Sequence, residues 1–254
     1  GCSQEKVQVI EGSIYGTTYS VQFTENVDKE EIHKLIKTEL NRIDMIFSTY
    51  KPSSDISLVN DCRRAFDPNV KYDWDCEREL GSPELRQLIL LSDRFFLKTD
   101  GAFYIRDESN RYSNGLQPMD LSAIGKGYAV DKIAELLVSN GVFNYFIDIG
   151  GELSINGTKF GELWTWGINN PINPDLGAYR AFKAPQDGIS IATSGEYRNP
   201  GHIWGSSTAS KAGASRDALS VTIVISKTSY NKWFSDISAI ANNNTANADA
   251  WATA

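Results

Sequence analysis

A run of twelve residues, Asp120–Asp131, combines a carboxylate, two glycines around a lysine and the start of a helix. Gly125 and Gly127 would let backbone amides approach a ligand closely, and Lys126 adds a positive charge. A helix that opens near Tyr128 would turn its first N–H groups toward the same space, as at helix N-termini that bind phosphate. The run therefore predicts an anion site. An ordinary left-handed turn before a helix is the alternative.

Generic nucleotide motifs do not account for this run, because its spacing is not that of a Walker loop and no G-x-G-x-x-G occurs. The chain of 254 residues is 41% hydrophobic and 22% charged, which is typical of a folded protein with one large or two small domains. A net charge of −7 without a Lys/Arg cluster argues against a nucleic-acid partner. No apolar run approaches the roughly 20 residues that span a bilayer, so the body of the protein is expected outside the membrane.

The three cysteines are Cys2, Cys62 and Cys76, and none of them forms the C-x-x-C spacing of a zinc site or a redox pair. Cys62 and Cys76 could pair in an oxidising compartment, and two free thiols are the alternative. Gly1-Cys2 before a polar stretch is what remains when a lipoprotein signal is removed, and an incidental start beside a free thiol is the alternative. The lipoprotein interpretation predicts a tether over residues 1–6 and a single domain over residues 7–254.

Hydrophobic periodicity predicts the elements that must hold the anion site. Alternation predicts two adjacent strands between Val7 and Phe23. Helical spacing and capping residues predict three helices: one from the Asp28 cap to Phe47, one from Ser82-Pro83 to just before Gly101, and one from about Gly127 through Leu137 to a stop at Asn140-Gly141. The segment from Asp61 to Gly81 is expected to be a loop.

The second half of the chain is richer in strands. Four features are expected there: a buried strand over Phe143–Ile149, a hairpin over Leu153–Trp166 with its turn near Asn156-Gly157, and strands over Ile189–Ala192 and Ser220–Ile225. Helices and strands mix without a strict βαβ alternation, which favours an α+β fold with mixed sheets and packed helices. The Ser/Ala/Asn-rich stretches 205–216 and 242–247 are expected to be mobile.

Six segments in one order show that the chain resembles the ApbE family of flavin transferases, which move FMN from FAD onto a Thr or Ser of another protein. Together they cover about two thirds of the chain, and the family implies an α+β architecture related to the T-fold. The segments are Gly16-Thr17-Thr18-Tyr19; Asp44 to Asn60 with Ser48-Thr49-Tyr50; Gly101-Ala102-Phe103; the Asp120 run with Asp148-Ile149-Gly150-Gly151-Glu152-Leu153; Ala192 to Tyr197; and Asp249 to Ala254.

The resemblance assigns a role to individual residues. It implies that Asp120 and Lys126 contact FAD, and that Tyr50 and the pair Ala102-Phe103 belong to the flavin site. It also implies a magnesium ion held by the carbonyl of Ala123 and by the side chains of Asp249 and Thr253. Hard oxygen ligands suit Mg²⁺, and a carboxylate with a hydroxyl four residues later shares one helical face.

The reaction that the resemblance implies needs positioning and charge neutralisation more than covalent chemistry by the protein. An acceptor hydroxyl attacks the FMN-side phosphorus of FAD, and AMP leaves. Mg²⁺ and Lys126 would stabilise the developing charge, and Asp249 counts as catalytic because it holds the metal. His202 is the histidine in the family position and the expected general base.

The chain departs from the family pattern at five places. His202-Ile203 is followed by Trp204-Gly205, so the family's Asp-Pro after this histidine segment is absent. Tyr104 replaces an aspartate, Tyr15 stands where a flavin-contacting methionine is common, and only a short link joins Tyr104 to Asp120. The usual final strand and helix do not follow Ala254. The fold is therefore expected to survive better than the activity.

Two other functions remain open beside Mg²⁺-dependent FMN transfer. One is an FAD pyrophosphatase, which would use water as the acceptor and release FMN and AMP. The other is a catalytically silent flavin-binding lipoprotein. The expected partners are FAD and an acceptor flavoprotein subunit of a membrane redox complex. The expected location is the periplasmic or other extracytoplasmic face of a bacterial membrane, with contact only through a lipid on Cys2.

Overall fold

The computed structural model describes residues 6–67, 75–98, 103–106, 115–170, 177–195 and 220–226. Within these residues the largest element is a six-stranded antiparallel sheet with the order β1-β2-β3-β4-β9-β10. Its strands are β1 (Gln8–Ile14), β2 (Thr17–Phe23), β3 (Tyr145–Ile149), β4 (Glu152–Asn156), β9 (Ile189–Gly195) and β10 (Ser220–Ser226). The predicted pair of strands at the start of the chain is confirmed.

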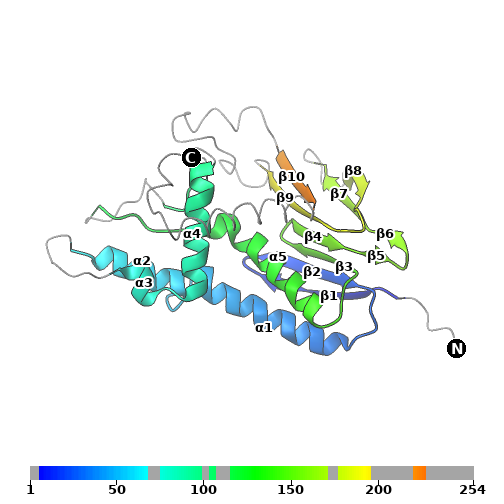
Figure 1. Cartoon of the computed structure of the whole chain (residues 1–254), viewed down its shortest axis with the longest axis horizontal. Coiled ribbons are helices and arrows are strands. Elements are labelled where there is room, and N and C mark those ends of the chain that lie inside the picture. Colours follow the sequence, from blue (N-terminus) through cyan, green and yellow to red (C-terminus); the bar gives the residue numbers. More distant parts are fainter. Residues whose placement is uncertain are drawn as a thin grey trace, which may run out of the picture.

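Two helices, α1 (Lys29–Phe47) and α5 (Ser122–Ser139), lie along one face of the sheet (Figure 1). Helix α1 begins as predicted, because the Asp28 carboxylate accepts hydrogen bonds from the first-turn N–H groups of Glu30 and Glu31. Its apolar stripe is buried along its whole length, from Ile32 to Phe47. The stripe fixes which side of α1 faces the sheet.

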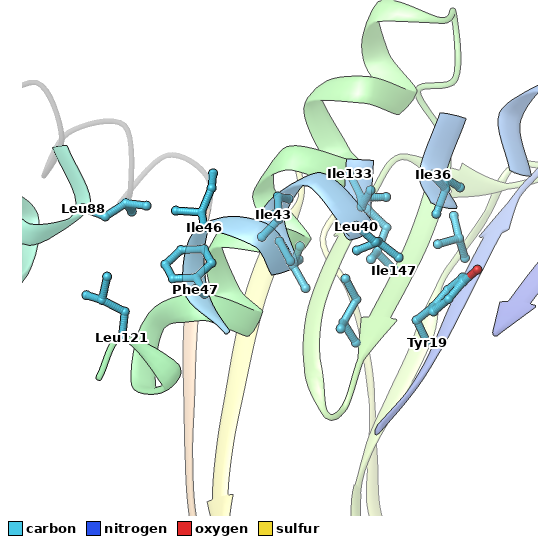
Figure 2. Close-up of a cluster of buried hydrophobic side chains, with 14 of the residues drawn as sticks. Tyr19, Ile36, Leu40, Ile43, Ile46, Phe47, Leu88, Leu121, Ile133 and Ile147 are labelled. Atoms are coloured by element: carbon cyan, nitrogen blue, oxygen red, sulfur yellow. The ribbon is translucent and has the colours of Figure 1, made fainter. Parts of the chain in front are cut away.

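The main core is formed where α1, α5 and the middle strands meet (Figure 2). Leu40 and Ile43 of α1, Ile133 of α5 and Ile147 of β3 are each at most 1% exposed. Alternate residues of β3 enter this core, since side chains of a strand point to opposite faces. The core locks the two helices onto the sheet.

A second apolar cluster covers the other face of the sheet, where Ile155, Ile189 and Ile191 pack with Trp164 and Trp166. Two small sheets supply the rest of this layer: β5 (Thr158–Lys159) with β6 (Glu162–Leu163), and β7 (Thr165–Asn169) with β8 (Ala178–Lys183). The predicted hairpin over Leu153–Trp166 is therefore wrong. A turn does follow Asn156, but β9 pairs with the free edge of β4, so the next residues leave the sheet.

The predicted loop over Asp61–Gly81 is also wrong in large part. Helix α2 (Asp55–Ala65) begins at the Ser54 cap and buries Ile56 and Val59, and a short helix α3 (Cys76–Leu80) follows. Cys62 and Cys76 form a disulfide with an S–S distance of 2.05 Å, which joins α2 to α3 and decides between the two alternatives for these cysteines. Helix α4 (Pro83–Lys98) starts at Ser82-Pro83 as predicted.

The glycines around Lys126 lie inside a helix and not in a turn. Helix α5 already begins at Ser122, whose N–H donates a hydrogen bond to the Asp120 carboxylate at 2.8 Å. Neither Gly125 nor Gly127 has a positive φ. The predicted helix start near Tyr128 is therefore wrong, and so is the alternative of a left-handed turn at these glycines. The predicted end at Asn140-Gly141 is confirmed.

The predicted α+β class is confirmed by this mixture of helices and antiparallel sheets. Among the described residues, no helix has both the length and the apolar character that a membrane crossing requires. The Ser/Ala/Asn-rich stretches 205–216 and 242–247 lie outside the described residues, as does Cys2. The division into a tether over residues 1–6 and one domain stays a prediction.

We expect Ile43→Ala to lower the free energy of unfolding by about 2–5 kcal/mol, because the side chain is fully buried between α1 and the sheet. Leu90→Ala is the matched control, since Leu90 is 60% exposed on α4. Denaturant titration followed by circular dichroism measures both. A loss for Ile43→Ala no larger than that for Leu90→Ala would contradict the packing described above.

We expect Gly127→Ala to raise the free energy of unfolding by about 0.5–1 kcal/mol, because glycine is unfavourable inside a helix and a Cβ at this position meets nothing within 4 Å. Gly141→Ala should have the opposite effect, since Gly141 ends α5 with a φ of 78°. The same denaturant titration decides. A lower free energy of unfolding for Gly127→Ala would contradict the helical conformation at this position and favour a turn.

Candidate functional site

A cavity of about 500 Å³ lies where the C-terminal end of α1 meets the N-terminal end of α5. Its size is typical of small-molecule sites. It brings together Tyr50, Asp120 and Lys126, three of the residues that the sequence singled out. The lining residues are Tyr15, Gly16, Asp44, Phe47, Ser48, Thr49, Tyr50, Asp120, Ser122, Gly125 and Lys126.

Lys126 supplies a positive charge to the cavity from the early part of α5. Its Nζ lies 2.7 Å from Glu152 Oε1 and donates a hydrogen bond to the Gly150 carbonyl at 3.2 Å. Gly150 lies in the turn between β3 and β4, and Glu152 is the first residue of β4. The lysine therefore ties the start of α5 to the end of β3, and it lies beside the first turn of a helix, where the dipole favours anions. The anion site stays a prediction, and the element that would provide it is a helix and not a turn.

The tight turn between β1 and β2 forms one wall of the cavity. Tyr15 and Gly16 have φ values of 55° and 71°, so a non-glycine residue occupies a left-handed position. The Tyr15 hydroxyl donates a hydrogen bond to the Leu40 carbonyl of α1 at 2.8 Å. Burial, and then the nearby Asp44 carboxylate, raise the pKa of Tyr15 well above its usual range, so the phenol stays a donor. The hairpin is thereby fixed to the end of α1.

The segment after α1 presents Tyr50, which is 95% exposed, at the cavity. Polar contacts hold the chain before and after Tyr50. Lys51 Nζ lies 2.6 Å from Asp44 Oδ2, and the buried Ser54 hydroxyl donates to the Ser48 carbonyl at 2.6 Å. An exposed ring on an anchored segment is suited to stack on a planar ligand.

Asp120 reaches the cavity because α2 holds the segment that carries it. The buried Asn60 side chain makes two hydrogen bonds of 2.8 Å with the Met119 backbone, one from its amide and one to its carbonyl oxygen. The Asp120 N–H donates to the Ile105 carbonyl at 2.7 Å. Asp120 is an exposed lining residue of the cavity, and its Oδ1 accepts a hydrogen bond from the Ser122 N–H.

The charges at the cavity do not balance. Asp44 is paired with Lys51 and Glu152 with Lys126, which leaves the Asp120 carboxylate in excess among these five described groups. Asp148 is a further carboxylate beside Lys126. Burial raises the pKa of Asp148 above its usual range, although the hydrogen bond from the Gly151 N–H and the charge of Lys126 both act to lower it. A ligand that carries phosphates would need further positive charge here.

The remaining sequence-predicted residues are distributed as follows. Ala123 is exposed on the first turn of α5, next to the cavity-lining Ser122. Phe103 packs edge-to-face on Phe95 of α4, with 5.4 Å between the two ring centroids, and it is not among the lining residues of the cavity. Three catalytic or metal residues and one flavin-site residue lie outside the described residues: His202, Asp249, Thr253 and Ala102.

Asn60 and Glu152 lie in segments that the sequence had singled out, but it gave them no role of their own. Both act through another residue: Asn60 positions Met119 and thus Asp120, and Glu152 holds Lys126. No spacing rule links residues 60 and 119, so only the fold reveals this contact. The Gly150-Gly151 pair was a usable signal for the second, because both glycines have a positive φ and bend the strand end toward α5.

The known proteins to which this chain is similar share one name or family. A curated FAD:protein FMN transferase of Vibrio cholerae is 27% identical over 78% of this chain and 69% of its own length. The Escherichia coli protein of the same name is 26% identical over the same shares. Among solved structures, the flavin transferase ApbE of Vibrio cholerae is similar with a TM-score of 0.63 and 22% identity, over 87% of this chain and 82% of that one.

A second solved structure, the apo flavinyl transferase ApbE of Pseudomonas stutzeri, has a TM-score of 0.61 and 22% identity over 78% of this chain and 71% of that one. These likenesses support the same fold. The family model described as "ApbE family" matches residues 15–110 and 108–254, which is most of the sequence. The resemblance carried by the six sequence segments is therefore confirmed, and the chain belongs to the ApbE family.

Proposed function

We propose that this protein transfers FMN from FAD to a Thr or Ser hydroxyl of an acceptor protein and releases AMP. The observation that carries the proposal is the cavity between α1 and α5, which joins Tyr50, Asp120 and Lys126 from three separate segments. The curated relatives bear the name FAD:protein FMN transferase. In flavin transfer, each of these three side chains would contact a different part of FAD.

The residues at the cavity suggest how FAD would lie. Lys126 and the first turn of α5 offer a charge and a helix dipole to the diphosphate. The exposed Tyr50 ring offers a stacking surface to the flavin, and the Asp120 carboxylate can accept from ligand N–H or O–H groups. Phe103 and Ala102 keep their proposed place in the flavin site by resemblance alone.

A magnesium ion fits the charge excess at the cavity, because a diphosphate would otherwise meet more negative than positive groups. The proposed ligands are the Ala123 carbonyl, Asp249 and Thr253, of which Ala123 belongs to the described residues. All three offer the oxygen atoms that Mg²⁺ prefers. The ion would neutralise charge that develops on the pyrophosphate oxygens.

The protein's own groups would then position the two reactants. Lys126 would hold the diphosphate so that the FMN-side phosphorus faces the acceptor hydroxyl. His202 would take the proton of that hydroxyl as general base, and AMP would carry away the bridging oxygen and its electron pair. The absence of the Asp-Pro segment after His202 makes its pH dependence the feature to measure first.

We also propose an extracytoplasmic location with a lipid on Cys2. The disulfide between Cys62 and Cys76 supports an oxidising compartment, because such bonds are rare in the reducing cytosol. The acceptor would then be a flavoprotein subunit of a membrane redox complex. Mass spectrometry of Cys2 in the protein purified from membranes tests the lipid directly.

The proposed activity is tested by incubation of the protein with FAD, Mg²⁺ and a peptide that carries an Asp-Gly-x-Thr motif. AMP and a peptide heavier by one FMN should appear together, because the two products come from one bond cleavage. AMP with free FMN and no labelled peptide would instead indicate a pyrophosphatase. FAD binding without AMP in any condition would indicate a silent flavin-binding protein.

We expect Lys126→Met to weaken FAD binding by roughly 1.5–3 kcal/mol, because the substitution keeps the apolar stem and removes a charged hydrogen-bond donor. Lys132→Met is the matched control, since Lys132 lies on the same helix and pairs with Glu135. Isothermal titration calorimetry measures both variants. Equal losses for the two lysines would remove Lys126 from the proposed diphosphate site.

We expect Asp249→Ala to abolish Mg²⁺-dependent AMP release while FAD still binds, because loss of an anionic ligand leaves the ion too weakly held. Activity of the wild type should disappear with chelator and return with added Mg²⁺. Circular dichroism checks that the variant folds. Undiminished AMP release by Asp249→Ala in excess chelator would refute the metal assignment.

A further inference from the structure

We propose that Glu152 is a positioning residue, which holds the Lys126 ammonium in a fixed direction so that one N–H is left for the diphosphate. This inference rests on the proposed function of Lys126 and goes beyond it. A lysine side chain on a helix surface has four rotatable bonds and loses much entropy when it is fixed. Contacts that fix it before the substrate arrives reduce that cost.

The contacts of the ammonium leave little freedom. Of its three N–H donors, one points to Glu152 Oε1 at 2.7 Å and one to the Gly150 carbonyl at 3.2 Å. The Lys126 side chain is 35% exposed and that of Glu152 only 16%. The third donor is therefore the one that a ligand in the adjoining cavity can use.

The β3–β4 turn brings the Gly150 carbonyl to the lysine and sets the start of β4, where Glu152 lies. Gly150 has a φ of 58°, and its N–H donates to the Thr18 carbonyl at 3.0 Å. A Cβ on Gly150 would lie 2.7 Å from the Thr17 methyl and 3.3 Å from Lys126 Cδ. The Asp148 carboxylate caps the turn through the Gly151 N–H at 2.9 Å. The absence of a side chain at Gly150 therefore leaves room for the aliphatic part of the Lys126 side chain to pack on the turn.

Glu152 is poorly placed for stability alone. Its second oxygen, Oε2, is buried and has no hydrogen-bond partner within the described parts of the chain. Burial of a carboxylate oxygen without a partner is unfavourable, and a buried ion pair is weak evidence for stabilisation. The pair Lys132–Glu135 on the same helix has the same separation of 2.7 Å, but its carboxylate is exposed, with 66% of the Glu135 side chain accessible. A role in fixing the Lys126 ammonium explains why residue 152 is a carboxylate.

The positioning role and a simple charge effect predict opposite signs. If Glu152 only adds a negative charge near the diphosphate, its removal should strengthen FAD binding. If it fixes Lys126, its removal should weaken binding in spite of the gain in net positive charge. The sign of the change therefore separates the two.

The experiment is a double-mutant cycle that measures FAD affinity by calorimetry. We expect Glu152→Ala to weaken FAD binding roughly tenfold, and Glu152→Gln to recover most of this loss, because its amide oxygen can still accept from Lys126. In the Lys126→Met background, Glu152→Ala should have no effect, since the interaction is already absent. Glu135→Ala is the matched control and should leave FAD affinity unchanged.

A second readout does not depend on FAD. The rate at which acetic anhydride labels Lys126, followed by mass spectrometry, should rise in Glu152→Ala, while the rate for Lys132 should stay constant. A purely structural role of Glu152 would change FAD affinity equally in both backgrounds and leave the relative labelling rates unchanged. That result, or tighter FAD binding by Glu152→Ala, would overturn the inference.

The two proposals fail in distinguishable ways. If the wild type does not bind FAD, or if Lys126→Met binds it as well as the wild type, the proposed function of the site fails, and the labelling rates alone decide whether Glu152 holds Lys126. If Lys126→Met weakens FAD binding and Glu152→Ala does not, only the positioning role fails.

Discussion

The burial of α1 and α5 against one face of the sheet is the constraint on which the site depends. Leu40 and Ile43 from one helix and Ile133 from the other enclose Ile147 of β3, and Figure 2 shows these side chains meeting in one layer. Because burial of apolar area drives this packing, the directions of the two helices are set by their apolar stripes. The end of α1 and the start of α5 then lie beside each other, and the cavity forms there.

Polar contacts refine what the core has placed. Each connects two elements at the cavity: the Tyr15 hydroxyl joins the β1–β2 turn to α1, the Asn60 amide joins α2 to the segment before Asp120, and Glu152 joins β4 to the lysine of α5. Hydrogen bonds of this kind add little net stability, but they select one arrangement out of several. The cavity therefore has a fixed polar lining on a scaffold whose stability comes from elsewhere.

The sequence predicted the fold class, the strands β1 and β2, and most of α1, because long periodic segments with caps have one consistent interpretation. It predicted Tyr50, Asp120 and Lys126 as neighbours through family resemblance. It missed α2 because that helix is polar over most of its surface, and it mistook the start of α5 because glycine usually marks turns. Contacts such as that of Asn60 with Met119 join residues far apart in the chain, so local patterns could not reveal them.

Under the proposed function, the cavity between α1 and α5 binds the flavin dinucleotide. A crystal structure of the protein grown with FAD and Mg²⁺ tests it most directly. We expect the diphosphate within hydrogen-bond distance of Lys126 Nζ and the flavin ring against Tyr50. Clear density for FAD at another place on the molecule, with this cavity empty, would contradict the claim.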